Sequence, residues 1–108
     1  MLYKSVTELI GNTPLIEINK EISGLKNVNL YVKCELYNPF GSLKDRAAYS
    51  MLKDEIERLK RENRTVIESS SGNTAKALQI LCAMNGIPFK TITNRIKIPE
   101  TKNVLKVC

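Results

Sequence analysis

The feature that most constrains the fold of this 108-residue chain is the alternation of strand-like and helix-like segments after residue 30. Short runs rich in branched and aromatic residues indicate strands, and longer runs with apolar residues three or four apart indicate helices. We expect strands at 30–36, 65–68 and 88–93, and helices at 44–60, at 74–85 and from Pro99 onward. This order is typical of an α/β fold with three layers, in which helices flank a mainly parallel sheet.

The apolar positions predict which side chains form the core. The helix at 44–60 carries its apolar face on Ala48, Leu52, Ile56 and Leu59. The segment 30–36 alternates apolar and polar residues, which predicts a strand with one buried face. Cys34 would then be a buried strand residue and Cys82 a core helix residue, and we expect neither to be catalytic.

Before the alternation begins, the sequence predicts one helical turn and one short strand. Ser5 and Glu8 have the spacing of a capping box, and Gly11 would end the turn. Residues 15–18 (LIEI) then read as a strand, followed by a loop before residue 30.

Composition excludes several classes of function. The absence of histidine excludes histidine-based triads and histidine-ligated metal sites, and the three cysteines fit neither a disulfide framework nor a zinc motif, so we expect no metal. The net charge of +6 is spread along the chain, so we do not expect nucleic-acid binding. No apolar run could span a membrane, and the first residues lack the apolar core of a signal peptide, so we expect a cytoplasmic protein.

The stretch NPFGSLKDR, residues 38–46, places Lys44 where a turn gives way to a helix, with Ser42 as a candidate N-cap. A lysine at a helix start faces the positive end of the helix dipole, which is unfavourable for a structural residue but favours the neutral amine. A neutral amine can form a Schiff base with an aldehyde. The alternative is a solvated lysine that pairs with Asp45 by chance.

A second polar stretch, SSSGNT at 69–74, also lies between a strand and a helix. Backbone N–H groups at a helix start lack partners within the helix and bind anions readily, so a carboxylate or phosphate is the natural ligand. The alternative is a helix capped by Asn73 or Thr74 without any ligand. In α/β sheets, ligands bind where strands give way to helices, and both stretches have this place.

Together the stretches resemble the cysteine synthase and cystathionine β-synthase family, which consists of pyridoxal-phosphate enzymes of fold type II. The similar segments are IGNTPLIEI (10–18), YVKCELYNPFGSLKDRAAYSML (31–52), ESSSGNTAKAL (68–78) and IPETKNVLKV (98–107). The pattern NPxGSxKDR, followed after one helix and one strand by SSGNT, is highly specific. The resemblance covers essentially the whole chain and implies the N-terminal part of the fold type II architecture.

The resemblance implies roles for individual residues. Lys44 would hold the cofactor, pyridoxal 5'-phosphate, as an internal aldimine and would move protons at the substrate α-carbon. Asn73 would hydrogen-bond the ring hydroxyl of the cofactor. Residues 38–42 would shape the turn that presents the lysine, while Asp45 and Arg46 would support the helix start. The loop that grips the substrate α-carboxylate would consist of Ser70, Ser71, Gly72, Asn73 and Thr74.

Some positions depart from the family pattern and leave the substrate open. Ser70 stands where cysteine synthases commonly carry threonine, and Ala75 and Lys76 stand where smaller or apolar residues are usual. The hydroxyl is retained at Ser70, so carboxylate binding remains compatible with this sequence.

The implied reaction is β-elimination and β-replacement on an O-activated serine. The expected activity is that of a cysteine synthase, which makes cysteine from O-acetylserine and sulfide; cystathionine β-synthase, serine or threonine dehydratase and diaminopropionate synthase-like enzymes are alternatives. The partners would be an amino-acid substrate, sulfide or another thiol, and a second copy in a homodimer. A hypothesis of another class is a truncated paralogue that acts as a non-catalytic interaction module.

The family holds the cofactor phosphate with a glycine- and threonine-rich loop further along the chain. The five glycines here are never adjacent, and the helix from Pro99 stops at Cys108 with its apolar face open. We therefore expect an N-terminal fragment that is inactive alone and lacks the C-terminal domain. The resemblance implies that residues 1–37 pack with that larger domain, and that 38–108 form part of the smaller, mobile α/β domain.

Overall fold

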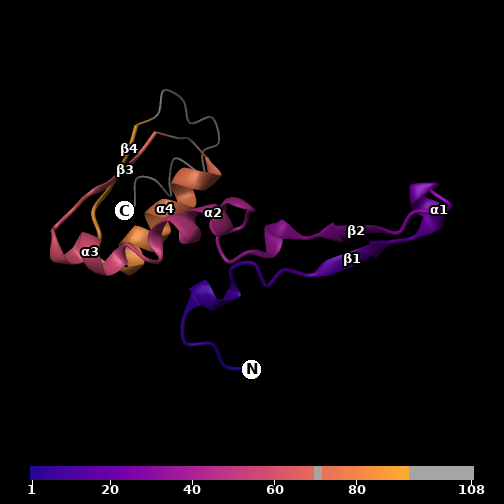
Figure 1. Ribbon diagram of the computed structural model, residues 1–108, viewed down its shortest axis with the longest axis horizontal. Coiled ribbons are helices and arrows are strands. Elements are labelled where there is room, and N and C mark those ends of the chain that lie inside the picture. Colours follow the sequence, from indigo (N-terminus) through magenta and orange to yellow (C-terminus); the bar gives the residue numbers. More distant parts are fainter. Residues whose placement is uncertain (70–71, 93–108) are drawn as a thin grey trace.

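The computed structural model describes residues 1–69 and 72–92. In chain order its elements are η1 (Val6–Leu9), β1 (Leu15–Ile18), α1 (Lys20–Ser23), β2 (Leu30–Lys33), η2 (Glu35–Tyr37), α2 (Lys44–Leu52), α3 (Ile56–Arg61), β3 (Val66–Glu68), α4 (Asn73–Met84) and β4 (Phe89–Thr91), where η marks a 3-10 helix. Figure 1 shows two parts: a long hairpin of β1 and β2, and a group formed by α2, α3, α4, β3 and β4 from which the hairpin projects.

The projecting hairpin is antiparallel, with Leu15 opposite Lys33 and Ile18 opposite Leu30. Its tip carries α1, a single helical turn where we expected a loop (Figure 1). All four residues of β2 are exposed, so the prediction of one buried face is wrong. An isolated two-stranded hairpin is marginally stable in water, so this part of the chain depends on contacts at its base.

The strand expected at 30–36 is too long. β2 stops at Lys33, and the next residues turn into η2 because Asn38 binds the carbonyl oxygen of Glu35 twice, from its backbone N–H at 3.1 Å and from Nδ2 at 2.8 Å. Such local bonds from an asparagine compete with strand pairing. Cys34 is therefore a half-buried turn residue, and its expected place in a buried strand is wrong.

The parallel pairing expected from the sequence is confirmed for two of the three strands. β3 and β4 run parallel, with Val66 opposite Phe89 and Glu68 opposite Thr91, and α4 forms the crossover between them. A parallel pair requires such a crossover, which the apolar segment after residue 73 supplies. The expectation that the first strand joins this sheet is wrong, since β2 pairs with β1.

The hydrophobic core lies where α2 packs against α4. α4 is buried along much of its length, as its apolar sequence predicted. Cys82 on this helix is fully buried, which confirms its expected core position. Burial raises the pKa of its thiol to about 11, so the group stays protonated and unreactive at neutral pH. The core consists of Phe40, Ala48, Leu52, Ala77, Leu78, Leu81, Cys82 and Ile87.

The single helix expected at 44–60 is two helices, α2 and α3, separated by three residues in turns. At the break, the Glu55 N–H donates to the Leu52 carbonyl at 2.9 Å, a 3-10 type bond that tightens and ends the first helix. The predicted apolar face is confirmed nevertheless. Ala48 and Leu52 are buried, and Ile56 and Leu59 pack against the core from α3.

The capping box at the N-terminus is confirmed as the start of η1. Ser5 Oγ accepts a hydrogen bond from the Thr7 N–H at 3.2 Å, and the Glu8 carboxylate accepts one from the Ser5 N–H at 3.2 Å. Within the described residues, no helix has the length and apolar character needed to cross a membrane. The helix expected from Pro99 and the end of the strand expected at 88–93 lie outside the described residues.

Candidate functional site

The turn before α2 presents Lys44 to solvent. The Gly41 N–H donates to the Asn38 carbonyl at 2.9 Å, and Gly41 has φ +96°, a conformation that favours glycine. Ser42 Oγ accepts from the Lys44 N–H at 3.1 Å, so Ser42 caps the helix start as expected, although Leu43 is the residue that flanks α2. Lys44 is the first residue of α2 and its side chain is exposed, available to a ligand.

The buried side chain of Asp45 holds this turn through a hydrogen bond to its backbone. Its side chain is fully buried, and Oδ2 accepts a hydrogen bond from the Phe40 N–H at 2.6 Å. Burial raises the pKa of Asp45, while the backbone N–H groups of Phe40 and Ser42 and the positive charge of Lys76 oppose that rise. Asp45 therefore supports the start of α2, as the sequence predicted, by binding the backbone five residues before it.

The start of α4 offers backbone donors that no side chain of the described residues caps. Gly72 precedes the helix with φ +88° and makes no side-chain cap bond, and Asn73, the first helical residue, is exposed. The first N–H groups of a helix have no partner within it. Thr74 is half-buried beside them, while Ser70 and Ser71 lie outside the described residues.

The two helix starts lie at the same end of the packed pair. α2 and α4 pack against each other, and Lys76 in the first turn of α4 reaches the turn before α2. Its Nζ lies 3.9 Å from the place that a Cβ on Gly41 would take. The structure thus brings Lys44 and Asn73 to the same end of two adjacent helices, although they are far apart in sequence.

Arg46 and Glu35 form an ion pair that fastens α2 to the base of the hairpin. Arg46 Nε donates to Glu35 Oε1 at 2.6 Å and Nη2 donates to Oε2 at 3.0 Å, a two-pronged arrangement that fixes the planes of both groups. Arg46 Nη2 also donates to the Gly11 carbonyl at 3.0 Å. Three segments meet here: the turn after η1, η2 and the first turn of α2. We call Glu35 and Arg46 the clamp.

Asn38 and Thr13 complete the bonds around the clamp. Asn38 is 4% exposed; its Oδ1 accepts from the Gly11 N–H at 2.8 Å and its Nδ2 donates to Glu35 Oε1 at 3.1 Å. Thr13 Oγ1 donates to Glu35 Oε2 at 3.2 Å. The Glu35 carboxylate therefore accepts hydrogen bonds from three side chains, on segments both before and after it.

These bonds make the stability of the protein depend on pH in a predictable direction. The hydrogen bond from Arg46 is the largest cause that lowers the pKa of Glu35 from 4.5 to about 2, with smaller contributions from Asn38 and Thr13. A carboxylate with a lowered folded pKa stabilises the fold above its unfolded pKa and loses that effect as the pH falls. We expect the stability advantage of the wild type over Glu35→Gln to be full above the unfolded pKa of 4.5 and to shrink as the pH falls to about 2.

Urea unfolding of the two proteins at a series of pH values checks this expectation. Asp45, whose pKa shift has the opposite sign, is present in both proteins, so its effect cancels in the difference. An advantage that stays constant across this whole range of pH would contradict the stated role of Glu35.

The approach of Arg46 to Gly11 gives a second prediction. A Cβ on Gly11 would lie 2.8 Å from Arg46 Nη1, and Gly11 has φ +82°. Gly11→Ala therefore combines backbone strain of about 1–2 kcal/mol with displacement of the clamp, and we expect a total loss of about 2–4 kcal/mol in the free energy of unfolding.

Gly24→Ala is the matched control for this substitution. Gly24 has φ +72°, but no atom lies within 4 Å of the place that a Cβ would take there, so this variant should show the strain alone. The measurement is denaturant unfolding of both variants. Equal losses would mean that the clamp tolerates displacement.

Sequence reasoning missed two residues of this site. It did not single out Glu35, whose only signal is its place three residues before Asn38 in a segment that resembled a strand. It noted Lys76 as a departure from a family pattern but not as a group that reaches Gly41 and Asp45. Both roles depend on contacts between segments, which no local pattern encodes.

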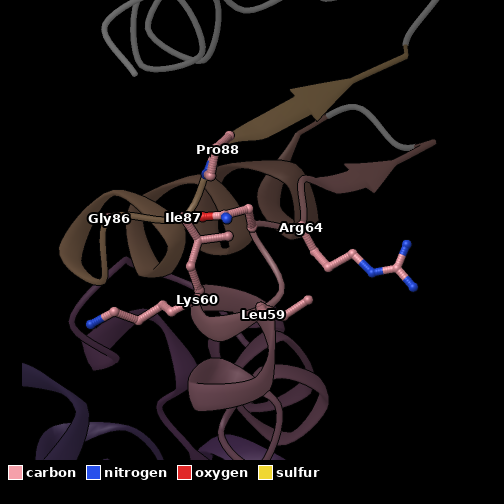
Figure 2. A pocket seen from close by; sticks show the side chains of 7 residues that line it. Leu59, Lys60, Arg64, Gly86, Ile87 and Pro88 are labelled. Carbon is pink, nitrogen blue, oxygen red and sulfur yellow. The ribbon is translucent and has the colours of Figure 1, made fainter.

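A cavity of about 270 Å³ lies elsewhere, between α3, the residues after it and the turn that leads to β4. Figure 2 shows the side chains of Lys60 and Arg64 directed away from it to opposite sides. It contains no residue of the two helix starts, and its charged groups do not converge on a ligand position. The residues that line it are Leu59, Lys60, Asn63, Arg64, Gly86, Ile87 and Pro88.

Comparison with known proteins identifies the family of this chain. The family model for pyridoxal-phosphate dependent enzymes matches residues 6–107. Cysteine synthase B of Campylobacter jejuni is 42% identical over 89 residues, covering 82% of this chain and 28% of the relative. Cystathionine beta-synthase of Saccharomyces cerevisiae is 43% identical over 108 residues, covering 95% of this chain and 20% of the relative.

Solved structures give the same result. O-acetyl serine sulfhydrylase isoform 3 from Entamoeba histolytica matches with a TM-score of 0.84 and 28% identity over 99% of this chain and 33% of that one. A hydrogen sulfide-producing enzyme from Fusobacterium nucleatum matches with a TM-score of 0.79 and 34% identity over 99% of this chain and 35% of that one.

The chain belongs to the family of pyridoxal-phosphate dependent enzymes, and its relatives within that family include cysteine synthases and a cystathionine β-synthase. The predicted fold type II α/β class is confirmed by the structural matches. The chain spans about a third or less of the length of the relatives that it matches.

Proposed function

We propose that this protein takes part in pyridoxal-phosphate dependent β-replacement on an O-activated serine, with O-acetylserine and sulfide as substrates and cysteine as product. The observation that carries the proposal is that the exposed lysine at the start of α2 lies at the same end of the packed helices as the start of α4, which no described side chain caps. A primary amine and a set of anion-binding backbone groups are what an aldehyde cofactor and an amino-acid carboxylate require. The relatives of the chain, cysteine synthases among them, favour this substrate pair.

The residues present fit pyridoxal phosphate in the chemistry of their donors. The amine of Lys44 would hold the aldehyde carbon of the cofactor and later move the proton at the substrate α-carbon. The exposed amide of Asn73 would hydrogen-bond the ring hydroxyl. When bound, the cofactor withdraws electrons from the substrate α-carbon, so that a leaving group on the β-carbon can depart.

The start of α4 would hold the substrate carboxylate. The N–H groups of Gly72, Asn73 and Thr74 belong to the first turn or the residue before it, where the helix dipole favours an anion. The hydroxyls of Ser70, Ser71 and Thr74 would add donors. This assignment makes the two stretches complementary, because one holds the reacting group and the other orients the substrate beside it.

The phosphate of the cofactor would be held by residues outside these two stretches. The five glycines of the chain are never adjacent, so it carries no glycine-rich phosphate loop.

We also propose that residues 1–37 pack with a second, larger domain. In support, Leu15, Ile16, Tyr31 and Val32 on the hairpin expose 62%, 49%, 50% and 43% of their surface, an apolar area that is stabilised when another surface covers it. A homodimer and a cytoplasmic location complete the proposal, as expected from the sequence.

Complementation tests the proposed function. The chain would be mixed with the remaining C-terminal part of Campylobacter jejuni cysteine synthase B, produced separately, and assayed for cofactor absorbance and for cysteine formed from O-acetylserine and sulfide. We expect cofactor binding and turnover in the mixture above the sum of the two parts. The absence of both would favour an interaction module without catalysis. A mixture of the C-terminal part with the Lys44→Ala chain is the control.

A further inference from the structure

The clamp of Glu35 and Arg46 lies outside the residues that would touch cofactor or substrate, yet it is the most heavily bonded group in the described part of the chain. Arg46 makes three hydrogen bonds to two segments, and Glu35 accepts bonds from Arg46, Asn38 and Thr13. An ion pair on a protein surface forms without such a network of additional hydrogen bonds. The other arginine with a short ion pair, Arg58, pairs with Glu55 and Glu62, the two residues that flank its helix α3.

The clamp adjoins the candidate site, because Arg46 lies on the same helix as Lys44. Arg46 is two residues after Lys44, in the first turn of α2, and its guanidinium is fixed from the side of the hairpin. Asn38, which binds Glu35, accepts the Gly41 N–H on its carbonyl and so begins the turn that presents Lys44. The same bonds thus hold both sides of the turn, before and after the lysine.

Two of the three side chains in this network are shielded from water. The side chain of Glu35 is 21% exposed and Asn38 is 4% exposed, whereas the side chain of Arg46 is 39% exposed. A guanidinium that meets a carboxylate through two parallel N–H bonds also fixes orientation, which a single ammonium contact would not do.

We propose that Glu35 and Arg46 are positioning residues, which set the orientation of the first turn of α2 and thereby aim the amine of Lys44 at the cofactor. The inference rests on the proposed function, because the orientation of the Lys44 amine matters only if that amine reacts with the cofactor. The inference goes beyond the proposed function because it gives residues at the base of the hairpin control over the orientation of the reactive lysine. A contact that shifts the hairpin would therefore change the orientation of Lys44 through the clamp.

The experiment compares Arg46→Gln and Glu35→Gln with Arg58→Gln, which breaks an exposed ion pair on α3 and serves as the matched control. Each protein, mixed with the C-terminal part of Campylobacter jejuni cysteine synthase B, is treated with pyridoxal phosphate and borohydride, and attachment at Lys44 is counted relative to Lys53. Lys53 follows α2 directly at its other end and is exposed, so general loosening of the helix would change both lysines together.

We expect the Lys44 to Lys53 ratio to fall about tenfold in the two clamp variants, since small displacements of a reacting group cost large factors in rate, and to stay unchanged in Arg58→Gln. An unchanged ratio in the clamp variants would overturn the proposal. Arg46→Lys adds a test of geometry: a lysine keeps the charge but not the paired N–H bonds, so it should not restore the ratio.

Amide hydrogen exchange tests, without any cofactor, whether the clamp holds the turn before α2 in place. The N–H groups of Phe40, Gly41 and Arg46 are bonded within or beside the turn, and we expect them to exchange about tenfold faster in the clamp variants but not in Arg58→Gln. Unchanged exchange would overturn the proposal. A wild type that shows no preference for Lys44 would instead contradict the proposed function, and the exchange result would still decide whether the clamp fixes the turn.

Discussion

The Lys44→Ala variant is expected to lose the attachment of pyridoxal phosphate at this helix start almost completely, while its free energy of unfolding stays within about 0.5 kcal/mol of the wild type. The loss follows because Lys44 supplies the exposed amine at this helix start, whereas Lys76, the other amine near this turn, is half-buried and interacts with Asp45. Stability is spared because the side chain is exposed and the capping bond to Ser42 Oγ is donated by the backbone N–H of residue 44. The measurement is peptide mapping after borohydride reduction, with urea unfolding in parallel.

Lys53→Ala is the control for this result. It removes an exposed lysine that adjoins the same helix at its other end, and it should leave attachment at Lys44 as it is. Attachment spread evenly over the surface lysines, with no loss in Lys44→Ala, would show that Lys44 is an ordinary solvated charge. That was the alternative which the sequence left open.

The second large effect is expected in the core, where Leu81→Ala should lower the free energy of unfolding by about 3 kcal/mol. Leu81 is 1% exposed and belongs to the cluster in which α4 packs against α2. The substitution removes buried apolar volume and leaves a cavity that the neighbouring helices can close only in part. Urea unfolding measures the change.

Met84→Ala on the same helix is the matched control. Met84 is 47% exposed, so its truncation should change the free energy of unfolding by no more than about 0.5 kcal/mol. Similar losses in the two variants would mean that the packing between α2 and α4 is not the main core of this chain. The candidate site would then lack the rigid support that the structure gives it.

Several parts of the fold followed from local patterns. The capping box of Ser5 and Glu8, the strand at 15–18 and the apolar helix after Gly72 were predicted from local patterns that agree with the fold around them. The two stretches that became the candidate site were also visible, because turn residues and hydroxyls cluster there. The single helix expected at 44–60 and the loop expected before residue 30 were wrong, and so was the segment 30–36, where the bonds of Asn38 to Glu35 outweighed a strand-like alternation.

The family, the alternation of strands and helices and the place of Lys44 at a helix start could all be predicted from the order of residues alone. Tertiary packing was needed to show which segments meet: β2 with β1 instead of β3, Lys76 with the turn at Gly41, and Glu35 with Arg46. This division follows from the range of the forces involved. Helix starts and turns depend on neighbours within a few residues, whereas strand pairing and ion contacts depend on which separate segments the tertiary structure brings side by side.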